Sequence, residues 1–245
     1  MTPTHAELTK LAGEYARKSP QDVLELACRA FGRVALAFSG AEDVVLVDMA
    51  SRLGVKPEVF FLDTGRLHPE TYRFLDKVRE RYRITLEAVF PSAPAVEALV
   101  KAKGLFSFYQ DGHQECCAIR KVEPLRRRLA AADAWITGQR RDQSRATRAA
   151  LSAVEADDDS VAGRTLAKFN PLAAWTSGDV WYYIHENDVP HNELHSRGFI
   201  SIGCEPCTRA TLPNQDEREG RWWWENAARK ECGLHLANTR KEEGE

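Results

Sequence analysis

The stretch that decides the fold is VALAFSGAED, residues 34–43. It begins with five apolar residues, which predict a buried strand, and continues with Ser39 and Gly40, which are typical of a tight turn. The apolar positions of residues 44–53 then favour a helix. A strand, a turn and a helix in this order present the N–H groups of the first helical turn at the end of the strand, where an anion can bind.

The same alternation continues on both sides of this stretch. Further strands are predicted at 58–62, 84–90, 134–137 and 166–170, and helices within 1–31 and at 69–82, 93–103, 121–132 and 177–187. Strands that alternate with helices indicate βαβ units and a parallel sheet covered on both faces. We therefore expect a doubly wound, mostly parallel α/β domain over residues 1–200, with a solvated loop at 156–164. Residues 201–245 form an extension that acts on this body.

Composition limits the classes of protein that fit. Of the 245 residues, 43% are hydrophobic and 29% are charged, which allows a sizeable core and excludes wholesale disorder. The net charge of -2 argues against a protein that coats nucleic acid or an anionic membrane. No apolar run approaches the ~20 residues of a transmembrane helix, and residues 1–20 lack the apolar core of a secretory signal. We expect a cytoplasmic protein with reduced thiols and with neither a nucleic-acid nor a membrane partner.

Three of the predicted strands end in small or polar residues, at 39–43, 63–66 and 138–141. In an open parallel sheet, ligands bind beyond the carboxyl ends of the strands. One Ser-Gly turn is often purely structural, but three such turns at one edge of a sheet favour a nucleotide pocket.

Four arginines follow within a short stretch, at positions 140, 141, 145 and 148. They fit a solvated face, and they also fit a clamp for phosphate or sulfate, because a guanidinium offers forked donors to an oxyanion. Binding of structured RNA is the least favoured interpretation, because the overall charge is nearly neutral.

Four of the six cysteines form two close pairs, Cys116-Cys117 and Cys204-x-x-Cys207. Adjacent cysteines have Cα atoms ~3.8 Å apart, below the usual ~4.4 Å minimum of a disulfide, so this pair is expected to serve a third body. A zinc site with four cysteine ligands is the simpler interpretation. An iron–sulfur cluster tolerates adjacent ligands better, because its ligand positions are spread over several irons. The spacing favours a cluster and leaves zinc open.

The two remaining cysteines differ in their surroundings. Cys28 falls in the apolar stripe of a predicted helix, which indicates core packing. Cys232 follows Arg218 and Arg221 and has Lys230 close by, and positive charge favours the nucleophilic thiolate. A lone cysteine at this place in a chain is often incidental, so the residue pattern alone leaves the role of Cys232 open.

Five motifs occur in order along the chain. They are SGAED at 39–43, LDTG at 62–65, CCAIRK at 116–121, CEPCTR at 204–209 and ECGLH at 231–235. Together they resemble the assimilatory adenylyl-sulfate reductases, the iron–sulfur branch of the phosphoadenylyl-sulfate reductase family. The similarity spans about residues 33–236. Each motif is modest by itself, but all five in this order are highly specific.

The resemblance implies an oxidoreductase of sulfate assimilation and cysteine biosynthesis, with a fold like that of the adenine nucleotide alpha hydrolases and a C-terminal catalytic tail. Adenylyl sulfate would be reduced to sulfite and AMP with two electrons from thioredoxin, through an S-sulfocysteine on Cys232. The family commonly forms homo-oligomers, and the sequence leaves the oligomeric state open.

The resemblance also implies roles for particular residues. Cys232 corresponds to the nucleophile, and Lys121 and His235 are expected to act beside it. One [4Fe-4S] cluster is expected on Cys116, Cys117, Cys204 and Cys207. The residues expected to bind the substrate are Ser39, Gly40, Asp63, Thr64, Gly65, Gly138, Arg140, Arg141, Arg218 and Arg221.

The first turn departs from a pattern that relatives of this fold carry. ATP pyrophosphatases have SGGxDS at this turn, whereas residues 39–44 are SGAEDV, which argues against cleavage of ATP to pyrophosphate. A cluster-dependent tRNA-thiolating enzyme would need those glycines and a larger basic surface. A zinc-stabilised module that binds nucleic acid would leave the motif at 231–235 unexplained. The sequence leaves open whether the substrate carries a 3′-phosphate, although the cluster cysteines associate with adenylyl sulfate in the family.

Overall fold

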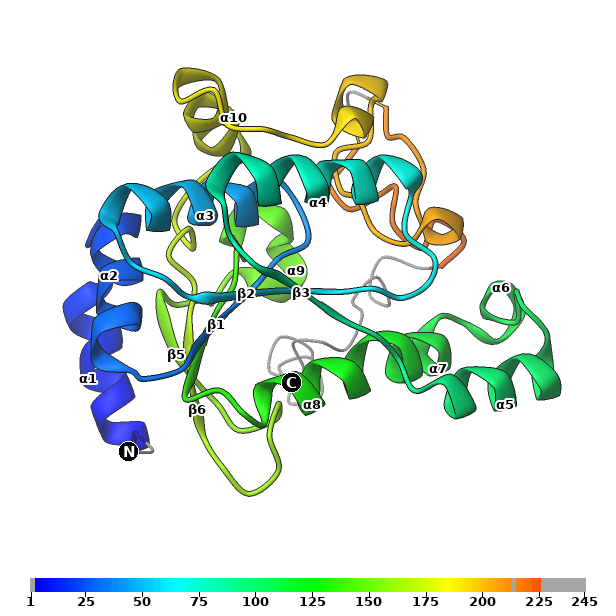
Figure 1. Ribbon diagram of the computed structural model, residues 1–245, viewed down its shortest axis with the longest axis horizontal. Helices are drawn as coiled ribbons and strands as arrows, with labels where there is room; N and C mark the ends of the chain where they lie inside the picture. Colours follow the sequence, from blue (N-terminus) through cyan, green and yellow to red (C-terminus); the bar gives the residue numbers. More distant parts are fainter. Residues whose placement is uncertain (1–2, 213–214, 226–245) are drawn as a thin grey trace.

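The computed structural model describes residues 3–212 and 215–225, without the side chains of residues 145 and 146. A six-stranded sheet lies between two layers of helices (Figure 1). The strands are β1 (Val34–Ala37), β2 (Glu58–Leu62), β3 (Leu86–Val89), β4 (Ala134–Ile136), β5 (Val154–Asp157) and β6 (Leu166–Phe169). Their order is β3-β2-β1-β4-β6-β5, and every neighbouring pair is parallel except β5 and β6. The predicted doubly wound, mostly parallel α/β fold is confirmed.

The strands alternate their side chains between two cores, because successive residues of a strand point to opposite faces. In β1, Val34 and Leu36 belong to the larger core, whereas Ala35 belongs to the smaller one. In β4, Ile136 and Trp135 divide in the same way. Both faces of the sheet are therefore buried, as a parallel sheet requires.

Helices on one face supply the larger core. They are α1 (His5–Tyr15), α2 (Pro20–Ala30), α3 (Ala41–Leu53), α4 (Pro69–Tyr82) and α10 (Ser177–Glu186). On the other face, α8 (Glu123–Leu129) packs on the smaller core, next to α5 (Ala93–Lys103), α6 (Phe108–Asp111) and α7 (Gln114–Cys117) (Figure 1). Among the described residues, no helix is long and apolar enough to cross a membrane.

Local signals set the helix boundaries. The helical region predicted within residues 1–31 divides into α1 and α2, because Ser19 caps the second helix and Pro20 occupies its first position. Helix α3 is terminated by Gly54, the residue after its last one. The φ of Gly54, 70°, lies in the left-handed region that glycine adopts without strain. The helix predicted at 121–132 begins instead within a π-helical turn, Ala118–Val122, which carries on from α7 into α8.

The expectation of a solvated loop at 156–164 is wrong at its start. Residues 154–157 form β5, the antiparallel edge strand. Its last residue, Asp157, is buried, and the carboxylate accepts a hydrogen bond from Trp135 Nε1 at 2.9 Å. The acidic run resembles a surface loop in sequence, but its first aspartate has a partner in the core that only the fold brings near.

The described part of the extension packs on the α/β body. Cys204 pairs with Leu67 in an isolated antiparallel bridge. The next N–H, that of Glu205, donates to the carbonyl of Arg66 at 2.8 Å, and Tyr109 Oη donates to the carbonyl of Pro206 at 2.6 Å. These contacts attach the extension next to the end of β2.

Candidate functional site

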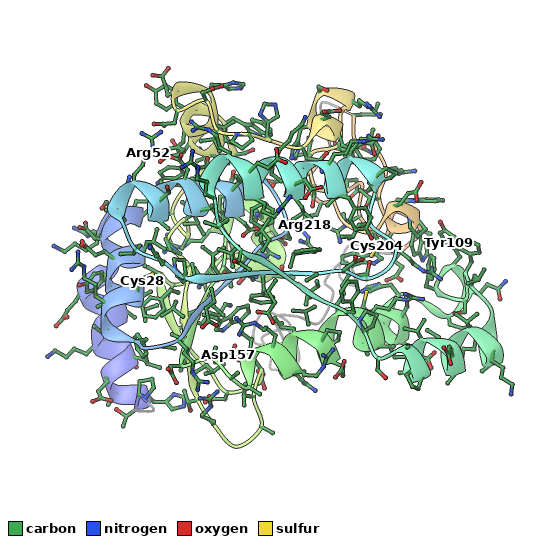
Figure 2. All side chains as sticks on the ribbon, in the orientation of Figure 1. Cys28, Arg52, Tyr109, Asp157, Cys204 and Arg218 are labelled. Carbon is green, nitrogen blue, oxygen red and sulfur yellow. The ribbon has the colours of Figure 1, made fainter. Side chains whose placement is uncertain are left out.

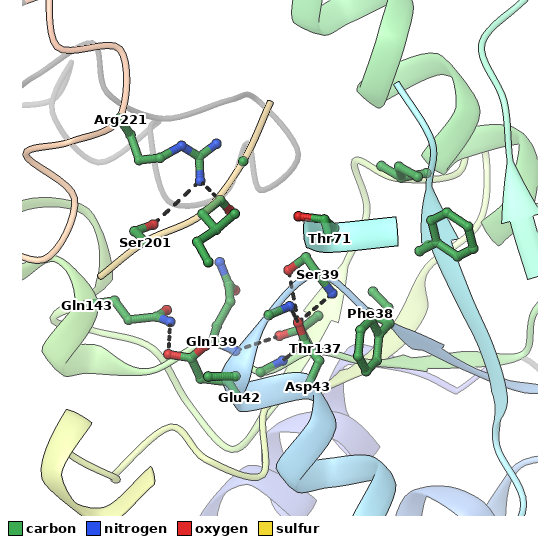
Figure 3. Close-up of a pocket in the computed structure, with 18 of the residues that line it drawn as sticks. Phe38, Ser39, Glu42, Asp43, Thr71, Thr137, Gln139, Gln143, Ser201 and Arg221 are labelled. Atoms are coloured by element: carbon green, nitrogen blue, oxygen red, sulfur yellow. Dashed lines mark hydrogen bonds between the residues drawn. The ribbon is translucent and has the colours of Figure 1, made fainter. Parts of the chain in front are cut away.

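A pocket lies at the carboxyl ends of β1, β2 and β4, at the place where the strand order reverses. Ligands of doubly wound sheets bind at such switch points. The strand ends contribute Ser39, Gly40, Thr64, Thr137, Gly138 and Gln139 to its wall. Figure 3 shows several of these side chains facing Ser201 and Arg221, which come from the extension. The chain therefore closes the pocket between its body and its extension.

A buried carboxylate, Asp43, organises the first turn. Its Oδ2 accepts from the Ser39 N–H at 2.7 Å, the Ser39 hydroxyl at 2.9 Å and the Gly40 N–H at 2.9 Å. Its Oδ1 accepts from the Gly138 N–H at 3.0 Å. Burial raises the pKa of Asp43 to about 6, the charge of Glu42 adds to the rise, and the donors from Ser39 and Gly40 oppose it. The N–H groups of Ser39 and Gly40, two residues expected from the sequence to bind the substrate, thus donate to Asp43.

Gly138 is needed for this arrangement. A Cβ atom at position 138 would stand 2.5 Å from Asp43 Oδ1 and 2.6 Å from the Cβ of Glu42. The absence of a side chain lets the turn after β4 approach the start of α3. Gly138 therefore links two of the strand ends through Asp43.

Replacing Asp43 with alanine should lower the free energy of unfolding by about 2–3 kcal/mol, because the buried N–H of Gly138 would lose its acceptor at about 1–3 kcal/mol and the partly buried N–H groups of Ser39 and Gly40 would lose theirs at a smaller cost. Asp179 is a matched control, since its carboxylate also accepts from a backbone N–H and a hydroxyl, both of Thr176, but at the surface. Asp179→Ala should cost about 1 kcal/mol. Urea unfolding of both variants checks the difference, and equal losses would contradict this role for Asp43.

The second turn joins the pocket to a cysteine. Thr64 lines the pocket, and its Oγ1 lies 3.2 Å from the Sγ of Cys204. Asp63 and Gly65 are not among the described residues that line the pocket. Instead, the Asp63 carboxylate accepts from the Gly65 N–H and from the Tyr72 hydroxyl, each at 2.8 Å, and so holds the turn.

The arginine stretch does not act as one clamp in this structure. Arg140 is buried and bonds to the carboxylates of Glu42 and Glu217. Arg141 donates from Nε to the carbonyl of Leu151 at 2.7 Å and does not line the pocket. Arg148 does line it. Of these three arginines, Arg148 therefore lies in the pocket wall, Arg140 pairs with carboxylates, and Arg141 binds a backbone carbonyl.

Arg218 and Arg221 of the extension both line the pocket. Their guanidinium carbons lie 5.7 Å and 4.7 Å from the ring centroid of the buried Trp222. Arg221 also donates from Nη1 to the carbonyl of Ile202 at 3.2 Å. The predicted pair of tail arginines is thus present at the pocket, on an aromatic support.

Buried polar atoms without partners mark the pocket as a place for a polar ligand. Within the described residues, the amide oxygen and nitrogen of Gln139, Nε2 of His195 and Nε of Arg221 have no hydrogen-bond partner, and all three side chains line the pocket. Such groups are costly to leave unsatisfied in a folded protein. His195 Nδ1 lies 2.8 Å from the Phe199 carbonyl, which can only accept, so in the neutral ring Nε2 is an acceptor. Gln139 lies in the turn at 138–141 that the sequence places at the pocket, but it is not among the residues expected to bind the substrate. His195 was missed altogether, because nothing in its local pattern shows that it reaches the pocket.

The four paired cysteines surround a second, smaller cavity. Its wall contains Cys116, Cys117, Cys204 and Cys207. Cys28 lies on the opposite side of the molecule, where it packs against the larger core as predicted (Figure 2). Within residues 3–212 and 215–225, no group of three or more histidine, cysteine or acidic side chains has the arrangement that holds a single metal ion.

Cations surround this cavity and act on its thiols. Arg66, Arg120 and Lys121 line it together with the cysteines. Burial is the largest single effect on Cys204 and opposes its ionisation, but the charge of Lys121, the Thr64 hydroxyl and the charges of Arg221 and Arg66 together outweigh it, so the pKa of that thiol is lowered. For Cys207, burial dominates and raises the pKa to about 12. Of these two thiols, Cys204 is therefore the better prepared to ionise.

Lys121 and Cys204 line both the pocket at the strand ends and the cysteine cavity, so the two cavities share a wall. The Lys121 ammonium lies 5.6 Å from the ring centroid of Trp222. His113 also stacks on the indole of Trp222, with ring centroids 4.2 Å apart. Its Nδ1 lies 2.8 Å from the Glu225 carboxylate. Lys121 thus lies in the wall between the cysteine cavity and the pocket.

Two of the expected catalytic residues, Cys232 and His235, lie outside the described residues. Figure 2 labels Arg218 and Cys204, two described residues of the extension that line the pocket.

Fold and site together define a class: an α/β protein whose arginine-lined pocket, at the switch point of its sheet, shares a wall with a cavity lined by four cysteines. Comparison with known proteins gives the family. Residues 33–210 match the phosphoadenosine phosphosulfate reductase domain, and the chain belongs to that family.

Individual relatives agree with this assignment. The chain is 59% identical over 234 residues to an adenosine 5'-phosphosulfate reductase of Pseudomonas aeruginosa, covering 95% of this chain and 88% of the relative. It is 56% identical to a probable chloroplastic 5'-adenylylsulfate reductase of Oryza sativa, where the match covers 93% of this chain and 49% of the longer plant protein.

Solved structures give the same fold. The crystal structure of a phosphoadenylyl-sulfate reductase from Candida auris, in a phosphate complex, matches with a TM-score of 0.72 and 29% identity, covering 85% of this chain and 99% of that one. The FMN adenylyltransferase of Candida glabrata matches with a TM-score of 0.54 at 14% identity, over 91% of this chain and 84% of that one, which is a likeness of fold alone.

Proposed function

We propose that this protein reduces adenylyl sulfate to sulfite and AMP. The observation that carries the proposal is the shared wall, where Lys121 stands between a pocket lined by Arg218 and Arg221 and a cavity lined by four cysteines. The pocket offers positive charge to the phosphate and sulfate of such a substrate, and the unpartnered atoms of Gln139 and His195 offer hydrogen bonds. The high identity to proteins named adenosine 5'-phosphosulfate reductase supports the same substrate.

The chemistry follows from an anionic nucleophile attacking an anionic group. The Cys232 thiolate attacks the sulfur of adenylyl sulfate, an S–S bond forms, the bond from sulfur to the bridging oxygen breaks, and AMP leaves with the electron pair. Lys121, Arg218 and Arg221 offset the repulsion between the charges and stabilise the leaving phosphate.

A thiol partner completes the turnover. A thiolate of reduced thioredoxin attacks the sulfur atom of Cys232, and sulfite leaves with the electron pair of the S–S bond. The second thioredoxin thiol resolves the mixed disulfide, so that Cys232 is regenerated and thioredoxin is oxidised. The two electrons thus come from thiols, and we propose thioredoxin as the protein partner.

The four cysteines of the second cavity are the proposed ligands of one [4Fe-4S] cluster. Each thiolate of such a cluster binds a different iron, so the sulfurs need not converge on one point, which suits a pair as close as Cys116 and Cys117. Their common cavity, the neighbouring cations and the lowered pKa of Cys204 support this donor set. When bound, the cluster would supply local charge that tunes the neighbouring pocket.

Other assignments follow from the family and stay predictions. We propose a cytoplasmic location, where thioredoxin keeps thiols reduced. We propose that the chain divides into a body, residues 1–200, and an extension, residues 201–245. We also propose that His235 acts beside Cys232. The protein is further proposed to form homo-oligomers, which a measurement of its mass in solution would test.

Sulfite release tests the proposed reaction. The purified protein is given reduced thioredoxin and either adenylyl sulfate or its 3'-phosphorylated form, and sulfite and AMP are measured. We expect sulfite from adenylyl sulfate, with one AMP for each sulfite. Turnover of the 3'-phosphorylated nucleotide alone would reassign the substrate, and release from neither would overturn the proposal.

The proposed cluster has its own test. Protein purified without oxygen should be brown and carry about four irons and four acid-labile sulfides per chain. Cys207→Ala should lower both contents together, whereas Cys28→Ala, in the larger core, should leave both unchanged. Stoichiometric zinc with no labile sulfide would contradict the cluster.

A further inference from the structure

We propose that Arg140 is a positioning residue, which places the tail arginines at the pocket through Glu217 and does not itself contact the substrate. This inference rests on the proposed function only in taking adenylyl sulfate as the ligand. It differs from the expectation drawn from the sequence, which has Arg140 bind the substrate.

The guanidinium of Arg140 is the junction of three distant segments. It is 1% exposed. Its Nη2 lies 2.8 Å from Oε1 of Glu42, at the start of α3, and 2.8 Å and 3.0 Å from the two carboxylate oxygens of Glu217, in the extension. Nε adds a second contact to Glu42 at 3.1 Å. A guanidinium with this many carboxylate contacts has little donor capacity left for a ligand.

Glu217 links the position of Arg140 to that of the tail arginines, because Glu217 directly precedes Arg218. The turn that follows is closed by the Arg221 N–H, which donates to the Arg218 carbonyl at 2.9 Å. Fixing the Glu217 side chain therefore fixes the start of the turn that carries both pocket arginines. The contact joins the extension to the body on the β4 side of the pocket.

Charge gives the contact a second consequence. Glu42 and Glu217 both line the pocket, and both reach the same guanidinium nitrogen. Without the Arg140 charge, two carboxylates would face each other beside a pocket for an anion. They would repel each other, which moves the extension away, and they would repel the substrate.

Arg128 is a matched control on the other side of the sheet. It is also buried, and it also bridges two carboxylates, with Nη2 2.7 Å from Glu58 and Nε 2.6 Å from Glu87. It does not line the pocket. A loss caused by breaking a buried arginine–carboxylate bridge in general would appear in both arginine variants.

The test measures binding of adenylyl sulfate by calorimetry, in the wild type and in R140Q, R140K, E217Q, R140Q/E217Q and R128Q. We expect R140Q and E217Q each to weaken binding about tenfold or more, R140K to recover part of the loss, and the double variant to bind no more weakly than R140Q, because the two side chains act as one unit. R128Q should bind like the wild type while losing thermal stability.

Unchanged affinity in E217Q, or losses in R140Q and E217Q that multiply in the double variant, would overturn the proposal. If R140Q does not fold, R140K and E217Q still decide it, because R140K keeps a positive charge at the junction and E217Q keeps Arg140 itself. Binding is measured apart from turnover. A wild type that binds adenylyl sulfate but releases no sulfite would therefore contradict the proposed reaction. The role of Arg140 would still be decided by the measured affinities.

Discussion

Cys232→Ser is expected to abolish sulfite release while leaving the iron content and the affinity for adenylyl sulfate unchanged. A serine hydroxyl ionises far less readily than a thiol and forms no S–S bond, so the covalent step is lost and turnover should fall about a thousandfold or more. Sulfite release with saturating nucleotide and reduced thioredoxin measures the loss.

Cys28→Ser is the matched control for this variant. Cys28 is the one cysteine among the described residues that lies away from the two cavities, packed against the larger core. Its replacement should lower thermal stability and leave turnover intact. Near wild-type turnover by Cys232→Ser would remove Cys232 from the mechanism.

Lys121→Met should lower kcat/KM by about a hundredfold or more. The variant keeps a long apolar stem but removes the charge from the wall that both cavities share. Losing one such preorganised group at a site of developing negative charge commonly costs about 10²–10³ in rate. Steady-state kinetics with adenylyl sulfate, together with the iron content, separate a loss of catalysis from a loss of the cluster.

Lys168→Met is the control for this charge. Lys168 is also a buried lysine beside a tryptophan ring, with its ammonium 5.7 Å from the Trp135 centroid, but it pairs with Glu155 and does not line the pocket. Its loss should destabilise the fold with little effect on kcat/KM. A similar fall in both variants would show that Lys121 acts through stability.

Much of the fold could be predicted from local patterns. The strand at 58–62 and the helices at 69–82 and 93–103 occur with the predicted bounds, because apolar runs, turn residues and a proline in the first turn of each helix agree there. The division at Ser19-Pro20 and the strand within the acidic stretch 154–157 were missed. In both places a signal from one or two residues competes with the average character of a longer segment.

The candidate site divides in the same way. The paired cysteines and the tail arginines could be proposed from sequence, because their spacing carries the signal. Asp43 and Gln139 could not be given their roles, since the acceptor function of one and the unpartnered amide of the other depend on segments far away in the chain. Arg140 is the clearest case, because two of its carboxylate partners, at positions 42 and 217, are brought to it only by the folded chain.

The central claim is that Cys232 takes up the SO3 group of adenylyl sulfate before any electron donor is involved. It is tested most directly by incubating the wild-type protein with adenylyl sulfate in the absence of thioredoxin and analysing its peptides by mass spectrometry. The account predicts one added SO3 group on the peptide that contains Cys232, released as sulfite when reduced thioredoxin is added. An adduct on another cysteine, or AMP formed with no adduct at all, would contradict it.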